Sequence, residues 1–526
     1  MELLARFERT AASQPDKPAI IYFSKRMRGW KRITYRSLFD QTQRFISGLQ
    51  ACSLTPGAVA VVMTPPSAEF FPFALALLKF GIVPVVFDPA IGLKKIGEVI
   101  AESKPEIYFG TWLTHTLRIL SGWGRDSIKH SLTVEKVKGR RSKIVPSPIV
   151  HDPSSAVAII YTSGSTGLPK GAVYTSANFA AQLELLQNTF RISPDEIDLA
   201  AFPLYALIDI LLGVTSVIPD ISFPVPGKTD PQKTISAIQR FNVTNMFASP
   251  VVLEILADEA YHSLNHKLPS LKRVITAGAP ATIHLQEKFR LLLDDHTDLF
   301  GIYGATETLP IAKVESREVF AVKEKTAHGA GICLGKPIEG VTVRIIPITD
   351  EPIAEWRESL EVESNAAGEI TVQSLATTRA YLHREEADRL SKIKFGDEII
   401  HRMGDVGYFD EEGRLWYCGR KSHRVVTKDG VMFTEQIENI FNAHPRVKRT
   451  ALVEENRKPV LWVELERRAG SNKDKIIGEL REMAKSHRQA SQIETFLFMK
   501  RFPTDARHNS KIIREELKAL AEKRLS

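Results

Sequence analysis

The chain has 526 residues, of which 43% are hydrophobic and 25% are charged, and its formal net charge is +8 at pH 7. These values are those of an ordinary globular protein that is long enough for two or more domains. The positive charge is compatible with anionic substrates or a membrane surface. Its densest stretch, residues 136–143, has no interleaved aromatic residues. We therefore expect a solvated surface loop there and no nucleic-acid partner.

Targeting and cysteine signals favour a cytoplasmic protein. The three cysteines lie far apart without any metal-ligand spacing, which indicates a reducing compartment. The first ten residues include acidic side chains and no uninterrupted apolar core, so they do not form a secretory signal. A lysine, a glycine and a proline interrupt the most apolar stretch, residues 70–89. This stretch predicts a buried helix over 73–80 and a strand over 82–87, with no transmembrane segment. Peripheral attachment to a membrane stays open.

Apolar patterns in the first 300 residues predict an alternation of strands and helices. Helical spacing marks three segments: the start of the chain, residues 35–49 and residues 176–190. Ser176 is the expected cap of the third helix. Strands are expected at 19–23, 58–63, 157–160, 243–247, 273–276 and 299–302. This order is typical of a parallel sheet covered by helices on both faces, with ligand groups at the strand ends.

The pattern changes in the second half of the chain. Short β segments are expected at 342–346, 369–373 and 414–417, with a hairpin turn at 410–413 before the last of them. Beyond residue 420 the chain changes to short strands and charged helices, the latter at 473–488 and 511–523. We predict an α/β fold with a large N-terminal domain, 1–420, that ends in a small β subdomain, and a small α+β C-terminal domain, 421–526.

The most informative motif is a hydroxyl- and glycine-rich stretch between two apolar strands. It offers hydroxyls, backbone amides, flexible glycines and a mobile cation, which suit a polyphosphate. The residues are Thr162, Ser163, Gly164, Ser165, Thr166, Gly167 and Lys170. A Walker P-loop is excluded because Gly171 and a strand follow Lys170, where that motif has Ser or Thr and a helix. A flexible linker is disfavoured because it needs neither Pro169-Lys170-Gly171 nor flanking strands.

A second motif, Tyr303-Gly304-Ala305-Thr306-Glu307, follows the strand at 299–302. Tyr303 offers a flat face for a purine, and Gly304 leaves room for backbone approach. Thr306 can donate to a phosphate and Glu307 can hold Mg²⁺. The alternative is a strand-to-loop turn with a surface glutamate. The strand at 273–276 likewise ends in Gly278-Ala279-Pro280, which we count among the nucleotide-binding candidates.

Three further charged residues can serve a nucleotide. Asp405 can accept from both ribose hydroxyls, and Arg420 can bond a hydroxyl or phosphate oxygen with its planar fork. The alternative is that these two residues only pair with each other on a hairpin. Lys511 stands at a loop-to-helix junction, where a solvated lysine is the alternative to a catalytic one.

The stretch 161–175 closely resembles the phosphate-binding signature of the adenylate-forming superfamily, which includes acyl-CoA synthetases, peptide-synthetase adenylation domains and luciferases. The resemblance implies ATP and Mg²⁺ as cofactors, with Thr306 on phosphate, Glu307 as the metal ligand, and Asp405 and Arg420 on ribose. It implies that Lys511 is the adenylation lysine, which reaches between the carboxylate and the α-phosphate. It also implies a mobile C-terminal domain, with Ser422 at the hinge position.

The chain departs from the superfamily at three places. Ser422 replaces the usual Asp or Lys, Ser510 replaces the Gly before the lysine, and Tyr205-Ala206 lacks the usual histidine. With these departures, segments 202–209, 419–425 and 442–447 are most similar to the β-lactone synthetases of bacterial long-chain olefin biosynthesis. That resemblance implies a β-hydroxy fatty acid substrate, a β-lactone product and other olefin-biosynthesis enzymes as partners.

Two alternative functions stay open. One is a fatty acyl-CoA ligase, which would need CoA. The other is a nucleotide-binding module without catalysis. It is disfavoured because the residues expected to serve separate steps are all present, namely Lys170, Thr306, Glu307, Asp405, Arg420 and Lys511.

One substrate contact is predicted from the residues. If residues 205–212 are helical, Tyr205 and Asp209 share a face that we expect to border the acyl pocket, where Asp209 accepts from a substrate hydroxyl. A helix-capping or internally paired Asp209 is the alternative.

Overall fold

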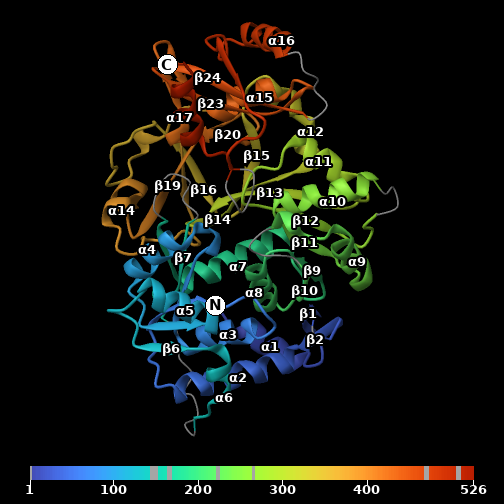
Figure 1. The fold of residues 1–526 in the computed structure, drawn as a ribbon, viewed down its shortest axis with the longest axis vertical. Coiled ribbons are helices and arrows are strands. Elements are labelled where there is room, and N and C mark those ends of the chain that lie inside the picture. Colours follow the sequence, from blue (N-terminus) through green and yellow to red (C-terminus); the bar gives the residue numbers. More distant parts are fainter. Residues whose placement is uncertain are drawn as a thin grey trace.

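A computed structural model of the chain describes residues 3–25, 27–142, 152–162, 169–220, 226–262, 267–466, 473–504 and 511–525. Within these residues the chain forms a large N-terminal lobe and a smaller C-terminal lobe, which lies at the top of Figure 1. Both lobes mix helices and strands. The predicted α/β class, with a large N-terminal and a small C-terminal part, is therefore confirmed.

The first sheet has six strands in the order β6-β5-β3-β4-β7-β8. The first five strands in this order, β6 to β7, run parallel, and β8 is antiparallel to its neighbour β7. Helices α2, α3 and α6 share one hydrophobic core of this sheet, and α4 and α5 contribute to another. The strands are β3 Val59–Met63, β4 Val83–Val86, β5 Ile107–Gly110, β6 His130–Leu132, β7 Ala156–Tyr161 and β8 Gly171–Thr175. The helices are α2 Tyr35–Ala51, α3 Phe70–Phe80, α4 Leu93–Ser103, α5 Trp112–Ser121 and α6 Val134–Gly139.

The second sheet follows the order β16-β17-β19-β20-β15-β14-β13-β12-β11-β9-β10-β1-β2, with β18 beside β19. Its middle is parallel from β13 to β1. The strands of this part are β1 Pro18–Ser24, β9 Ile197–Ala200, β10 Thr215–Ile218, β11 Asn245–Ala248, β12 Arg273–Thr276 and β13 Asp298–Ala305, and β2 Gly29–Thr34 is the antiparallel strand at the edge beside β1. The helices are α1 Ala5–Ser13, α7 Ser176–Phe190, α8 Pro203–Leu212, α9 Pro231–Phe241, α10 Pro250–His262 and α11 Ile283–Arg290.

The antiparallel end of this sheet contains the three predicted β segments and begins earlier in the chain than predicted, at residue 308. Its strands are β14 Thr308–Glu315, β15 Ile332–Pro337, β16 Thr342–Ile346, β17 Gly368–Gln373, β18 Lys392–Phe395, β19 Glu398–Phe409 and β20 Leu415–Arg420. Short helices accompany them, namely α12 Ser316–Ala321, α13 Lys323–Ala327 and α14 Glu385–Ser391. The turn at 410–413 joins β19 to β20, where the Gly413 amide donates to the Asp410 carbonyl over 2.9 Å.

The C-terminal lobe has cores of its own. Two hydrophobic clusters there contain no residue before Val425. The lobe consists of β21 Val425–Thr427, β22 Gly430–Met432, β23 Val447–Glu455, β24 Lys458–Leu465, β25 Thr495–Phe498, α15 Thr434–Asn442, α16 Lys473–Ser486 and α17 Arg514–Leu525. A separate core is what a domain boundary near residue 421 requires. The exact boundary stays a prediction.

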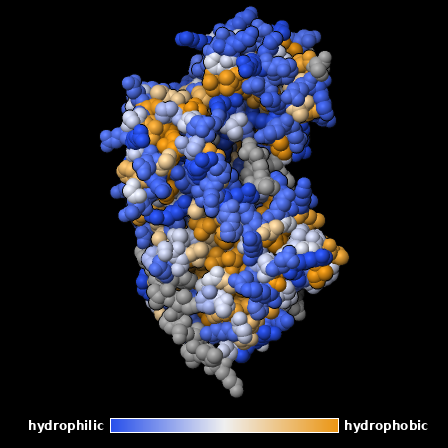
Figure 2. Space-filling model, turned by 90° about the vertical axis from the view of Figure 1, so that its left-hand side faces the viewer, coloured by the Kyte–Doolittle hydropathy of each residue, from blue (hydrophilic) through white to orange (hydrophobic). Residues whose placement is uncertain are grey.

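The largest core of the N-terminal lobe lies between its two sheets, where α1, α3, α7 and α8 meet (Figure 1). On the face shown in Figure 2, hydrophobic side chains gather mainly in the lower, N-terminal half, while the upper lobe is mostly hydrophilic. In the described part of the chain, every helix is too short or too polar to cross a membrane.

Three details differ from the sequence predictions. The alternating strands form two sheets instead of one, and β7 and β8, which a short loop joins, pair in antiparallel orientation. The cap of α7 is Thr175, whose side chain accepts from the Asn178 amide, because this last residue of β8 already has extended backbone. The basic stretch begins in helix α6 rather than in a loop, and Lys143 lies outside the described residues.

Candidate active site

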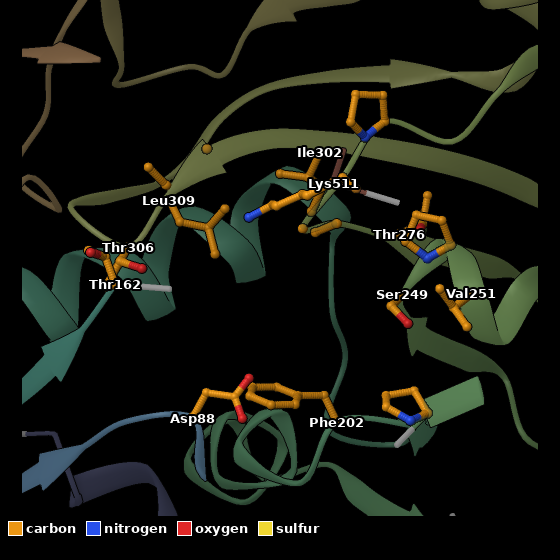
Figure 3. Close-up of a pocket in the computed structure, with 18 of the residues that line it drawn as sticks. Asp88, Thr162, Phe202, Ser249, Val251, Thr276, Ile302, Thr306, Leu309 and Lys511 are labelled. Atoms are coloured by element: carbon orange, nitrogen blue, oxygen red, sulfur yellow. The ribbon is translucent and has the colours of Figure 1, made fainter. Parts of the chain in front are cut away.

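A cavity of about 4410 Å³ lies between the lobes and continues into the N-terminal lobe. It is several times larger than a typical ligand pocket, so ATP and a long acyl chain can both be accommodated. Residues from both lobes line it, among them Thr162, Thr306, Asp405 and Lys511. Figure 3 shows that Lys511 extends its ammonium into this cavity, on the side where Thr162 and Thr306 lie.

The two ends of the phosphate loop are bound to each other. The Thr162 amide donates to the Lys170 carbonyl over 2.9 Å, and the Lys170 amide donates to Thr162 Oγ1 over 3.3 Å. The loop is therefore the tip of the β7–β8 hairpin, and its ends face the cavity. Its other predicted ligands, Ser163, Gly164, Ser165, Thr166 and Gly167, lie outside the described residues.

The Tyr303–Glu307 motif forms the turn of the β13–β14 hairpin. Strand β13 continues to Ala305, which pairs with Thr308, so the motif does not follow the strand but ends it. Added at Gly304, a Cβ would lie 2.4 Å from Leu309 Cδ1 and 3.0 Å from the Thr308 carbonyl oxygen. The space that we assigned to an approaching ligand is thus filled by the hairpin itself.

Two tyrosines hold this turn. Tyr174 Oη, from β8, donates to the Thr306 carbonyl over 2.5 Å. Tyr381 Oη donates to Glu307 Oε1. Glu307 is only 9% exposed, so the alternative of a surface glutamate does not apply. Neither tyrosine was identified from the sequence, because a strand pattern such as that of β8 does not show what its side chains contact, and Tyr381 and Glu307 meet only through the fold.

Asp405 is the centre of the predicted ribose site. It is 3% exposed, Tyr303 Oη donates to its Oδ2 over 2.7 Å, and Arg420 Nη1 lies 3.0 Å from its Oδ1. Burial raises the pKa of Asp405, and the Arg420 charge opposes this. Among the described residues, Oδ1 has the ion pair but no well-directed hydrogen bond. The hairpin pair that we named as the alternative is therefore present, and Asp405 and Arg420 both line the cavity.

Lys511 is held by its neighbours in the C-terminal lobe. Ile512 forms a bridge with Thr504, and the Ile513 amide donates to the Pro503 carbonyl over 3.0 Å. Arg514 begins α17 and makes a bidentate ion pair with the buried Glu438, at 2.6 and 3.0 Å. Burial raises the pKa of Asp405, and the charge of Lys511 is among the smaller influences that oppose this rise. The preceding residue, Ser510, lies outside the described residues.

An apolar arm of the cavity extends between α3, α7 and α8. Its lining includes Phe70, Leu77, Phe179, Leu186, Leu204 and Ile208. Tyr205 also lines it, and its ring stacks on Phe247 with centroids 4.0 Å apart. Gly278, Ala279 and Pro280 line the cavity after β12, as predicted for a strand end. An apolar arm of this kind can hold an alkyl chain.

Asp209 belongs to an internal network instead of the cavity wall. Helix α8 is present as predicted, but Asp209 is 3% exposed and accepts from Ser216 Oγ over 2.7 Å. Asp198, in register with Ser216 on the neighbouring strand, is its second partner. This arrangement corresponds to the internally paired alternative, because two buried carboxyl groups can share one proton.

The pair of aspartates should make stability depend on pH. Burial raises the pKa of Asp198 to about 7 and that of Asp209 well above the usual carboxyl range. Unfolded carboxyl groups ionise near pH 4, so between about pH 4 and 7 the folded state binds more protons, and its stability falls as pH rises. The variant Asp198→Asn removes the part of this effect that comes from Asp198 and its charge on Asp209. Its thermal midpoint, relative to the unchanged protein, should be higher at pH 8 than at pH 5; an equal difference at both values would contradict the shared proton.

The residue set fits a nucleotide-bound magnesium ion. No group of three or more His, Cys, Asp or Glu in the described ranges could hold a metal without help. Mg²⁺ is commonly bound by one or two carboxylates together with substrate phosphates and water. Glu307, beside the phosphate loop, could supply such a carboxylate.

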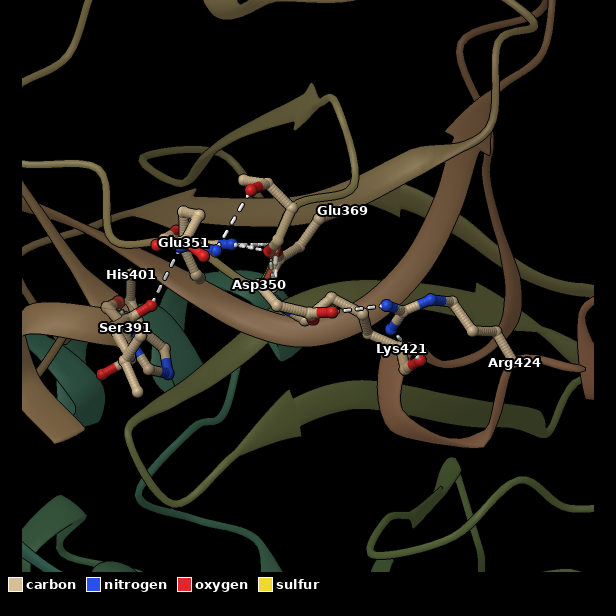
Figure 4. Close-up of polar contacts among 10 residues, drawn as sticks. Asp350, Glu351, Glu369, Ser391, His401, Lys421 and Arg424 are labelled. Atoms are coloured by element: carbon tan, nitrogen blue, oxygen red, sulfur yellow. Dashed lines mark hydrogen bonds and ion pairs between the residues drawn. The ribbon is translucent and has the colours of Figure 1, made fainter. Parts of the chain in front are cut away.

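The segment that joins the lobes is tied to the β subdomain (Figure 4). Ser422 lies in the turn η4 Lys421–His423 and lines the cavity. Lys421 Nζ donates to the Thr349 carbonyl over 2.9 Å and to Glu369 Oε2 over 3.2 Å. Arg424 Nη2 donates to Asp350 Oδ2 over 2.5 Å. These contacts fix the chain directly after Arg420 in the present arrangement.

The fold and this set of residues define a nucleotide-dependent enzyme. The model of the AMP-binding enzyme family matches residues 7–382, and the chain belongs to this family. It is 39% identical over 509 residues to an olefin beta-lactone synthetase of Xanthomonas campestris, covering 92% of this chain and 90% of the relative. The corresponding protein of Stenotrophomonas maltophilia is 37% identical over 540 residues, covering 98% and 97%. These findings confirm the predicted superfamily and an adenylate-forming enzyme.

Solved structures show the same fold. ATP-bound MatB from Rhodopseudomonas palustris superposes with a TM-score of 0.81 at 19% identity, over 100% of this chain and 99% of that one. An O-succinylbenzoate coenzyme A synthetase (MenE) from Bacillus subtilis, in complex with ATP and magnesium ion, gives 0.78 at 20% identity, over 97% and 98%.

Proposed function

We propose that the chain uses ATP and Mg²⁺ to activate a β-hydroxy fatty acid as its acyl-adenylate and then closes this intermediate to a β-lactone. One observation supports the adenylation step most directly. Lys511 extends its ammonium into the cavity toward the side where Thr162, one end of the phosphate loop, and Thr306 lie. The apolar arm between α3 and α8 supports a fatty acyl chain. The likeness to olefin beta-lactone synthetases supports the closure.

Each residue of the cavity then has a distinct task. The hydroxyls and amides of the phosphate loop, with Lys170, bind the β- and γ-phosphates. Asp405 and Arg420 bind the ribose, and Tyr303 orients Asp405. Glu307 would hold Mg²⁺, which neutralises charge on the phosphates. Gly278, Ala279 and Pro280 border the nucleotide.

Lys511 acts on the first chemical step. A carboxylate oxygen attacks the α-phosphorus, and the bond to the β-phosphate oxygen breaks to release pyrophosphate. Negative charge accumulates where the two anions meet, and an ammonium group between them lowers the barrier. In the second step the β-hydroxyl oxygen attacks the activated carbonyl, the bond between the carbonyl carbon and the AMP oxygen breaks so that AMP leaves, and the hydroxyl proton passes to solvent. An attacking group on the same molecule benefits from proximity.

The contacts of the joining segment favour this route over a CoA ligase. Lys421 and Arg424 hold the turn that contains Ser422, and a lactone-forming enzyme can complete both steps without bringing an external thiol to the adenylate. A fatty acyl-CoA ligase is the second candidate, since relatives at 24% identity include a 4-coumarate--CoA ligase-like protein of Arabidopsis thaliana.

Mass spectrometry of the products decides between them. Incubated with ATP, Mg²⁺ and a racemic β-hydroxy fatty acid, the chain should form a product 18 mass units lighter than the acid, because closure removes the elements of water. CoA should not change this product. Formation of an acyl-CoA thioester, and no lactone, would contradict the closure. If neither a lactone nor a thioester forms from the β-hydroxy acid, with or without CoA, the proposed function as a whole is contradicted.

A further inference from the structure

Glu307 is bound by a neutral donor although two cations lie nearby. Tyr381 Oη donates to Glu307 Oε1, and both side chains are less than a tenth exposed. Lys170 Nζ and Lys392 Nζ lie 5.2 and 5.3 Å from the centre of the Tyr381 ring. A hydroxyl fixes one carboxylate oxygen without cancelling the charge, whereas an ion pair with either lysine would neutralise it.

Each lysine has another contact. Lys392 Nζ donates to the Thr378 carbonyl over 2.6 Å, while Lys170 stands over the ring at the end of the phosphate loop. A cation over an aromatic face is attracted by the ring. The Tyr381 ring therefore lies beside both cations while its hydroxyl serves the carboxylate.

The backbone around Tyr381 connects Glu307 to the phosphate loop. The Leu382 amide donates to the Gly171 carbonyl over 2.8 Å, and the Val173 amide donates to the Ala380 carbonyl over 3.1 Å. Segment 380–382 thus pairs with β8 directly after Lys170. The Thr378 amide also donates to the Glu307 carbonyl over 2.8 Å. One short segment therefore fixes both the carboxylate and the strand that ends the loop.

We propose that Tyr381 is a positioning residue for the metal site. Its hydroxyl turns the Glu307 carboxylate so that the charge stays available for a magnesium ion, and its backbone sets the spacing between that carboxylate and the phosphates. This inference rests on the proposed use of ATP and Mg²⁺. Residues that orient a metal ligand typically change metal affinity by about 10- to 100-fold when they are replaced.

The test compares Tyr381→Phe with Tyr108→Phe. Tyr108 is a fully buried tyrosine whose hydroxyl donates to the Thr114 carbonyl over 3.0 Å, and it does not line the cavity. Binding of α,β-methylene-ATP is measured by calorimetry at increasing Mg²⁺ concentration. The Mg²⁺ concentration for half-maximal binding should rise by about tenfold or more in Tyr381→Phe only. In ATP–pyrophosphate exchange, excess Mg²⁺ should restore the rate.

A double variant shows whether Tyr381 influences Mg²⁺ binding through Glu307. In a Glu307→Gln background, Tyr381→Phe should change Mg²⁺-dependent binding little, because the carboxylate that it orients is gone. An unchanged Mg²⁺ requirement in Tyr381→Phe, an equal loss in both backgrounds, or a failure of Tyr381→Phe to fold would overturn the inference. If the unchanged protein binds the analogue with Mg²⁺ but shows no exchange, the proposed function fails while the inference is still decided by calorimetry.

Discussion

Replacing Lys511 by alanine should reduce fatty-acid-dependent ATP–pyrophosphate exchange by at least about a hundredfold, because removal of one preorganised group that stabilises developing charge typically costs 10²–10³ in rate. The lysine enters the cavity from the C-terminal lobe, whereas the ribose site and the phosphate loop belong to the N-terminal lobe. ATP binding should therefore change much less than the rate. The measurement is isotope exchange at saturating substrates, beside calorimetry with α,β-methylene-ATP.

Lys523→Ala is the matched control for this prediction. Lys523 is an exposed lysine of α17, on the helix that follows Lys511, so its removal should leave exchange unchanged. An exchange rate for Lys511→Ala close to that of the control would mean that Lys511 does not act on the reaction.

The variant Glu369→Ala should destabilise the N-terminal lobe by about 3–5 kcal/mol, the usual result of removing one partner from a buried ion pair. Glu369 is 1% exposed, and its Oε2 accepts from Arg402 over 2.6 Å and from Lys421 over 3.2 Å. Without the carboxylate, the partners of the buried Arg402 among the described residues are the carbonyl groups of Thr349, Glu351 and Leu390. Denaturant unfolding followed by tryptophan fluorescence measures the loss.

A double variant separates charge from packing at this position. Glu369→Met with Arg402→Met replaces both partners by apolar groups and should recover part of the lost stability, since the buried Arg402 charge is then removed together with its carboxylate, while Lys421 still loses this partner. The exposed Glu412→Ala serves as the control for loss of a surface carboxylate. A loss below about 1 kcal/mol for Glu369→Ala, the range of a surface pair, would show that the ion pair is not desolvated as described.

The local motifs of the nucleotide site could be read from the sequence because their chemistry is contained in a few consecutive residues. The apolar run before Thr162 and the strand after Lys170 predict a strand, a loop and a strand, which is what β7 and β8 are. The pairing of Asp405 with Arg420 was anticipated as an alternative for the same reason. Both residues flank one hairpin turn, and the fold places them in register.

Contacts between distant segments could not be predicted in this way. Tyr381 and Glu307 are 74 positions apart, and neither the period of the surrounding residues nor their type shows that they meet. The helix that contains Asp209 was predicted correctly, but the partners of Asp209 were not. They are Asp198 and Ser216, which belong to two strands that precede and follow this helix. The division of the strands into two sheets could not be predicted either, because a pattern of apolar residues does not show which strands pair.

The transfer of a labelled oxygen tests the adenylation most directly. A β-hydroxy fatty acid whose carboxyl group carries two ¹⁸O atoms is incubated with the chain, ATP and Mg²⁺, and the nucleotide product is examined by mass spectrometry. Since the attacking carboxylate oxygen stays on the α-phosphorus when the lactone closes, AMP should carry one ¹⁸O. Unlabelled AMP, or ADP together with labelled inorganic phosphate, would contradict an acyl-adenylate.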